Sequence, residues 1–133
     1  MKLDLSPLVK AIARLQEGFD RYQKDPSDLQ IRDGLIQRFE FTYEQCHKML
    51  KRYLKWASST PEMFDTMPFQ DLIRSANDQG LLQGDWSQWK NYREMRSKTS
   101  HTYDEPIACE VVQTIPVFLR EAHYLCDQLQ NRL

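Results

Sequence analysis

Apolar side chains recur every three or four residues through the longest patterned segment of the chain, residues 29–57. This spacing places them along one face of an α-helix, whereas the side chains of a β-strand alternate between two faces. The main row consists of Ile36, Phe39, Tyr43, Cys46, Leu50, Tyr53 and Ala57. A second row beside it consists of Leu35, Thr42, Met49 and Trp56. The pattern predicts the central helix of a bundle, and the second row could pack on a neighbouring helix or on a second subunit.

Rows of the same kind predict four further helices. A long helix is expected over residues 5–22 and another over residues 106–132. The row of the last helix continues in phase beyond Pro116, so this proline is expected to kink the helix without ending it. Residues 69–79 predict a short helix and residues 86–99 a longer one.

Short polar segments separate these helices and supply their end signals. Ser27 or Asp28 can cap the helix that follows them, and Asp85 can cap the helix after the QGD turn. Gly80 ends the short helix, and residues 58–68 are expected to form a loop. The economical packing is an all-α, antiparallel up-and-down four-helix bundle with one short extra helix, in a single domain covering residues 1–133.

The composition limits the function classes that fit this chain. The formal net charge is -1, so any contact with nucleic acid must come from a local basic patch. No apolar run reaches the roughly 18 residues of a membrane span, and we expect a soluble cytoplasmic protein. Cys46, Cys109 and Cys126 are widely spaced, which predicts reduced thiols and no metal site.

A concentration of functional side chains occurs in NYREMRSKTSHTYDEP, residues 91–106, which includes Arg96, His101 and Tyr103. On one continuous helix, Arg96 and His101 would lie about 140° apart around the axis. The helix is therefore expected to end between them, so that both can approach one phosphate near the amino terminus of the last helix. Asp104 and Glu105 suit the positive end of that helix.

An arginine and a histidine at one phosphate suit RNA cleavage by the adjacent 2′-hydroxyl. Histidine titrates near neutral pH and can move the protons of this reaction. Arginine supplies fixed positive charge to the phosphate oxygens. The spacing of Arg96 and His101 alone is equally typical of two side chains on a solvated helix end.

Two further groups of side chains can be interpreted either as nucleic-acid contacts or as ordinary structural residues. The basic residues are Lys48, Lys51, Arg52, Lys55, Lys90, Arg93 and Lys98. They could hold a nucleic-acid backbone or form a solvated face. Trp86, Trp89 and Tyr92 could stack on bases or belong to the core. His47 and His123 are interpreted as structural.

Two separated motifs, in this order, resemble the HEPN superfamily. The first is an R-F-E-x-T-x-E run within residues 36–54, and the second is an R-x4-H-x-Y motif within residues 95–106. More narrowly, the chain resembles the nucleotidyltransferase substrate-binding proteins, the HEPN half of bacterial two-protein MNT–HEPN modules, also known as HepT-like proteins. The motif residues are Arg38, Phe39, Glu40, Thr42 and Glu44, followed by Arg96, His101 and Tyr103.

The resemblance implies an all-α four-helix bundle that forms a homodimer with a shared cleft. It implies a metal-independent ribonuclease toxin without a cofactor, with Arg96 and His101 as catalytic residues. The partner implied is a separately encoded minimal nucleotidyltransferase, which silences the toxin by transferring AMP from ATP to Tyr103. Ser97, Asp104, Arg38 and Glu40 are the expected supporting residues.

One position departs from the family pattern. The family usually has asparagine or another strongly polar residue after the motif arginine, whereas this chain has Ser97, a shorter hydrogen-bonding side chain. Other family members are noncatalytic subunits that bind substrate for a nucleotidyltransferase. This second function remains open for the chain.

Overall fold

The computed structural model describes residues 3–133 and contains, in that range, five α-helices, two short 3-10 helices and no strand. No helix in this range is long and apolar enough to cross a membrane. The α-helices are α1 (Ser6–Lys24), α2 (Leu29–Trp56), α3 (Phe69–Asp78), α4 (Trp86–Lys98) and α5 (Glu105–Arg132). The 3-10 helices are η1 (Pro61–Phe64) and η2 (Thr99–His101).

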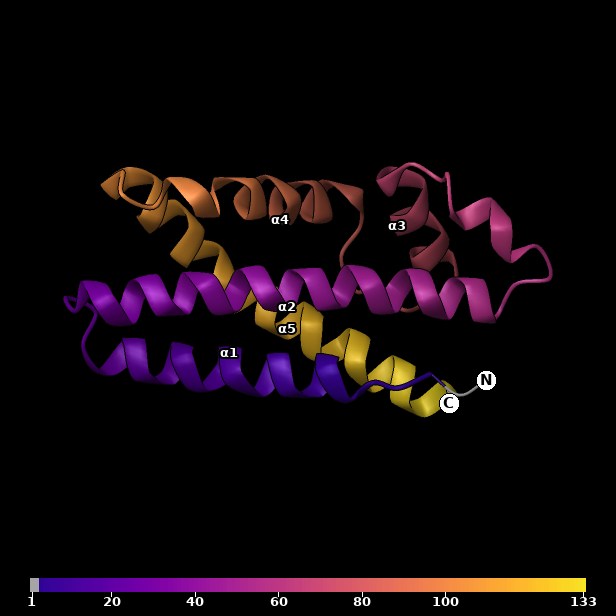
Figure 1. Ribbon diagram of the computed structural model, residues 1–133, viewed down its shortest axis with the longest axis horizontal. Coiled ribbons are helices and arrows are strands. Elements are labelled where there is room, and N and C mark those ends of the chain that lie inside the picture. The colour runs from indigo at the N-terminus through magenta and orange to yellow at the C-terminus, as the bar shows by residue number, and fades with distance from the viewer. Residues whose placement is uncertain (1–2) are drawn as a thin grey trace.

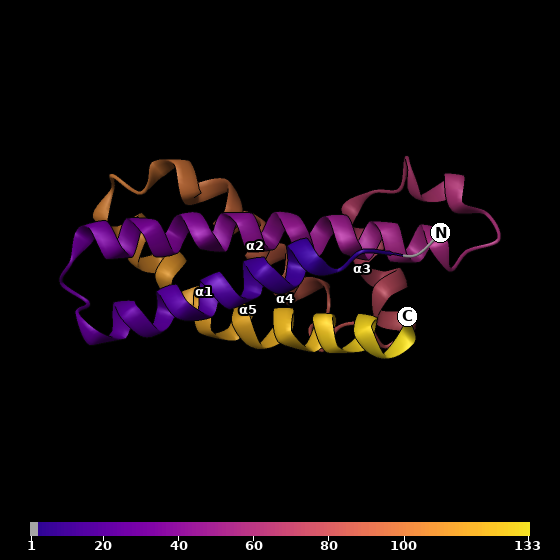
Figure 2. The same cartoon turned by 60° about the horizontal axis from the view of Figure 1, so that its bottom comes forward.

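Helix α2 is the central element of an antiparallel bundle (Figure 1). Helix α1 lies beside it and runs in the opposite direction, and α4 runs back along the first half of α2. Helix α5 then returns diagonally, packing against α1, α2 and α4 (Figure 2). The short helix α3 contacts the second half of α2. The predicted four-helix bundle with one short extra helix is confirmed.

The helix boundaries follow the sequence signals closely. Asp28 caps α2 by accepting hydrogen bonds from two backbone N–H groups, and Asp85 caps α4 in the same way with one. Gly80 has a φ of 72°, a left-handed conformation that ends the α3 segment. Helix α5 continues through Pro116. The expected loop over residues 58–68 contains the short helix η1, and the Phe64 side chain of η1 is buried.

Both apolar rows of α2 are buried within the chain, except at the carboxyl end of the helix, where Trp56 is 49% exposed. In the main row, the Phe39 ring meets Phe118 of α5 edge to face, with ring centroids 5.0 Å apart. In the second row Leu35, Thr42 and Met49 are fully buried, and the Thr42 hydroxyl lies 3.2 Å from the Ala11 carbonyl of α1. The interpretation that this row packs on a second subunit is therefore wrong for these residues. The homodimer stays a prediction that rests on the family resemblance.

A buried carboxylate on α5 fixes the start of α4. Glu121 accepts hydrogen bonds from the backbone N–H groups of Gln83 and Gly84, at 2.9 and 2.8 Å. It also accepts one from the indole N–H of Trp89 at 2.8 Å. Three donors replace the water that a buried carboxylate loses, so the group is well satisfied. The loop before α4 and the first turns of α4 are thereby held against α5.

Candidate active site

Arg96, in the last turn of α4, is held by two carboxylates of α2. Its Nε donates to Glu44 at 2.8 Å, and its Nη2 lies 2.7 Å from the same Glu44 oxygen. Glu40 is 3.6 Å from Nη2. The Arg96 side chain is one-third exposed (33%), and its Nη1 has no hydrogen-bond partner within residues 3–133. The two carboxylates orient the guanidinium and leave both N–H bonds of Nη1 for an anion.

Glu40 also ties the end of α4 to α2 through Thr99. The buried Thr99 hydroxyl lies 2.9 Å from a Glu40 oxygen and 2.7 Å from the Arg96 carbonyl. Helix α4 ends at Lys98, and the single turn η2 follows. The predicted helix end between Arg96 and His101 is confirmed, and its physical basis is this buried threonine anchored on a carboxylate.

His101 and Tyr103 project from the segment between α4 and α5. We call this segment, together with the last turn of α4, the α4–α5 junction (residues 96–104). Both side chains are exposed, Tyr103 at 85%, and their ring centroids are 6.1 Å apart. Within residues 3–133, the His101 side chain has no hydrogen-bond partner. Its imidazole is therefore available to a bound molecule.

The start of α5 closes the α4–α5 junction. The Asp104 carboxylate accepts a weak hydrogen bond, 3.4 Å long, from the Ile107 N–H and so caps the helix. Glu105 forms an ion pair with Arg32, which is buried near the start of α2. Asp104 thus supports the backbone that carries His101 and Tyr103, and Glu105 anchors that backbone to α2.

The remaining two predicted supporting residues form their hydrogen bonds with groups other than Arg96 and His101. The Ser97 hydroxyl donates to the Glu94 carbonyl at 2.7 Å, within α4 itself. The Arg38 side chain turns toward α1, where it donates to the Arg14 carbonyl at 2.8 Å and lies 3.5 Å from Glu17. The structure therefore groups Glu40 with Arg96 and places Arg38 on the α1 side of α2.

A small pocket of about 250 Å³ lies beside Arg96. Glu44 and His47 of α2 line it with Phe69, Arg93 and Ser97. Burial lowers the pKa of His47, which favours the neutral imidazole near pH 7. A neutral imidazole can donate one hydrogen bond and accept another, and it adds no charge to the pocket. The sequence suggests only a structural role for His47, whereas in the structure it faces the pocket that contains Arg96.

Sequence reasoning missed Glu44 as the main partner of Arg96. Glu40 and Glu44 are four residues apart and so lie on one face of α2, and this spacing is the signal that could have found the pair. Thr99 carried no such signal, because its role depends on contact with Glu40.

The basic and aromatic groups found in the sequence are only partly free to contact a nucleic acid. Lys55 pairs with Asp65, and Lys98 pairs with Glu110 at 3.0 Å. Trp89 and Tyr92 are fully buried, so the core interpretation is confirmed for them and base stacking is excluded. Within residues 3–133, no three His, Cys, Asp or Glu side chains gather closely enough to hold a metal ion.

The fold and the α4–α5 junction define the class of this chain. Residues 3–131 match the family described as nucleotidyltransferase substrate binding protein like. The chain belongs to this family of HepT-like HEPN proteins, as the two motifs indicated.

A curated protein and a solved structure, both from Haemophilus influenzae, show the similarity in detail. The chain is 39% identical over 139 aligned positions to the probable ribonuclease HepT, covering 98% of this chain and 94% of that protein. It is 35% identical to HI0074, with a TM-score of 0.89 and coverage of 96% of this chain and 99% of that one. The HI0074 structure is described as the fold of a substrate binding domain of a nucleotidyltransferase.

Proposed function

We propose that this protein is a HEPN-type ribonuclease toxin that cleaves RNA without a metal ion. The observation that carries the proposal is the α4–α5 junction: an exposed His101 follows an Arg96 whose guanidinium is fixed by Glu44 and Glu40. The similarity to the probable ribonuclease HepT supports the same activity. Both reactive side chains reach the surface, as a macromolecular substrate requires.

The reaction is an attack of a ribose 2′-hydroxyl on the adjacent phosphorus. The new bond joins the 2′-oxygen to phosphorus, and the bond from phosphorus to the 5′-oxygen breaks. His101 accepts the proton of the 2′-hydroxyl and then, as the protonated imidazole, donates a proton to the leaving 5′-oxygen. The products are a 2′,3′-cyclic phosphate and a 5′-hydroxyl, and His101 returns to its neutral form. Arg96 stabilises the negative charge on the phosphate oxygens through its available Nη1 group.

Tyr103 is the proposed site of inhibition by a separately encoded nucleotidyltransferase. Its phenol is 85% exposed and its ring lies beside His101. The phenolic oxygen attacks the α-phosphorus of ATP, pyrophosphate leaves, and the phenol proton is released. The attached AMP places bulk and negative charge beside His101, where an RNA phosphate must bind, and so blocks the site.

We expect the protein to gain AMP when it is incubated with ATP, magnesium and the neighbouring nucleotidyltransferase. Intact mass spectrometry should show the adduct on the wild type and none on Tyr103→Phe. Tyr124→Phe, a change on α5 outside the α4–α5 junction, is the matched control and should still be modified. An adduct on Tyr103→Phe would contradict the assignment.

A noncatalytic subunit that binds substrate for a nucleotidyltransferase is the second candidate function. One observation favours it: Glu40 and Glu44 offset the positive charge of Arg96, which weakens its attraction for a phosphate. The description of HI0074 as a substrate binding domain is consistent with it. A ribonuclease should slow growth when expressed alone and be relieved by its partner, whereas a binding subunit should do neither.

A further inference from the structure

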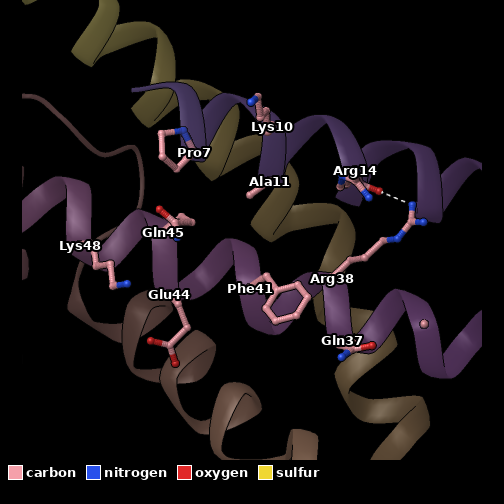
Figure 3. A pocket seen from close by; sticks show the side chains of 11 residues that line it. Pro7, Lys10, Ala11, Arg14, Gln37, Arg38, Phe41, Glu44, Gln45 and Lys48 are labelled. Atoms are coloured by element: carbon pink, nitrogen blue, oxygen red, sulfur yellow. Dashed lines mark hydrogen bonds between the residues drawn. The ribbon is translucent and has the colours of Figure 1, made fainter. Parts of the chain in front are cut away.

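A long groove runs between α1 and α2 on the outer face of the bundle (Figure 3). Its volume is about 750 Å³, three times that of the pocket beside Arg96. Its walls come from the outward faces of the two helices and combine charged and amide side chains with Pro7, Ala11 and Phe41. The groove therefore offers both polar and apolar contacts to a bound molecule.

The groove carries an excess of positive charge. Lys10 and Arg14 of α1 and Lys48 of α2 line it, and none of the three forms an ion pair within residues 3–133. Lys10 and Arg14 are one helical turn apart, about 6 Å along the axis of α1. Arg38 adds a fourth cation that is shared with Glu17. Glu44, the one acidic residue of the lining, is already paired with Arg96.

An aromatic side chain lies between these cations. Phe41 is 55% exposed, although most large apolar side chains of α2 are buried. Its ring projects from α2 into the groove, and the amide groups of Gln37 and Gln45 flank it along the helix (Figure 3). An exposed ring with cations on both sides is the arrangement by which proteins stack a base and hold the phosphates on either side of it.

The groove is linked to the α4–α5 junction through Glu44. This residue lines both the groove and the small pocket beside Arg96. Its carboxylate lies on the side of α2 away from α1 (Figure 3), 2.7 Å from the Arg96 guanidinium. A strand lying along the groove would therefore pass beside the residue that holds Arg96. The sequence places Lys48 in one group with other basic residues of α2 and with those of α4. In the structure, Lys48 lines the groove together with Lys10 and Arg14 of α1.

We propose that the groove between α1 and α2 binds single-stranded RNA and guides it to Arg96 and His101. Phe41 stacks on a base, and Lys10, Arg14 and Lys48 contact phosphates. The link to cleavage rests on the proposed function, whereas binding in the groove does not require cleavage. A second copy of the chain is a poorer occupant, because a two-fold interface would set this basic patch against itself.

The test measures binding of a fluorescent 2′-O-methyl RNA oligonucleotide by anisotropy. This probe lacks the free 2′-hydroxyl that the reaction needs and so reports binding alone. Phe41→Ala is expected to raise the dissociation constant by roughly 5- to 100-fold, the usual loss for one stacked base. The pair Lys10→Gln and Arg14→Gln should weaken binding and reduce the salt dependence, by about 0.7 in slope for each phosphate that the protein no longer neutralises.

The matched control removes two exposed cations outside the groove, with Lys24→Gln and Arg120→Gln. It has the same net charge as the groove pair and should bind the probe almost as the wild type does. Equal loss in both pairs, or no loss in the groove variants, would overturn the proposal. It would also be overturned if light scattering showed that Phe41→Ala only dissociates a dimer.

The experiments distinguish a failure of the proposed ribonuclease activity from a failure of RNA binding in the groove. Cleavage of unmodified RNA that is unchanged in all groove variants would contradict the groove and leave the nuclease standing. Loss of probe binding in the groove variants, in a protein that cuts no RNA, would support the groove and contradict the nuclease.

Discussion

Replacing His101 with alanine is expected to lower the rate of RNA cleavage by roughly 10²- to 10⁴-fold, the usual contribution of a positioned acid–base group. The fold should be unaffected, because the side chain is exposed and has no hydrogen-bond partner within residues 3–133. Single-turnover cleavage of a fluorogenic RNA measures the rate. Circular dichroism checks that the helix content and the melting temperature remain those of the wild type.

His123→Ala is the matched control for this change. His123 is also an exposed helical-bundle histidine, but it lies on α5, where its Nε2 is 3.4 Å from the Gln16 side chain. Cleavage by this variant should equal that of the wild type. Wild-type rates in His101→Ala, or an equal loss in both variants, would remove His101 from the proposed reaction.

Replacing Glu121 with alanine should produce the largest loss of stability among single substitutions of charged residues. The change leaves three N–H donors without their acceptor, those of Gln83, Gly84 and the Trp89 indole. Two of these donors, those of Gly84 and the Trp89 indole, are buried. Each unsatisfied buried donor costs about 1–3 kcal/mol, so the free energy of unfolding should fall by roughly 2 kcal/mol or more. Denaturant unfolding, followed by circular dichroism, measures the change.

Glu94→Ala provides the comparison, since Glu94 is an exposed carboxylate on α4. A surface change of this kind is expected to alter the free energy of unfolding by no more than about 0.5 kcal/mol. If Glu121→Ala were as mild as this control, Glu121 would not be the anchor of the α4 segment.

The helices could be predicted well because their signals are local. Apolar periodicity, Asp28 and Asp85 as caps, and Gly80 as a terminator all act within a few residues. What covers an apolar row could not be predicted in this way. The row of Leu35, Thr42 and Met49 looks the same whether α1 or a second subunit covers it, and only the tertiary structure shows that α1 does.

The sequence predicts which side chains gather at the candidate site, but not what holds them in place. Arg96, His101 and Tyr103 stand together because their motif is contiguous, and their roles stay a prediction. The Arg96–Glu44 contact joins residues 52 positions apart, and the Trp89–Glu121 hydrogen bond joins residues 32 apart. Such contacts depend on how the helices pack against one another. The spacing of Glu40 and Glu44 marks a carboxylate pair on α2, but it does not say which side chain of another helix the pair meets. The groove between α1 and α2 could not be predicted for the same reason. Its cations come from both helices, so it exists only once the two helices pack together.

Cleavage of RNA at the α4–α5 junction through the 2′-hydroxyl leaves a chemical signature on the fragments. The most direct measurement is to incubate the purified wild-type protein with RNA in excess EDTA and to determine the ends of the fragments. We predict cleavage that yields 2′,3′-cyclic phosphate and 5′-hydroxyl ends, and none in His101→Ala. Intact RNA after incubation with unmodified wild-type protein, or fragments carrying 5′-phosphates, would contradict the proposed reaction.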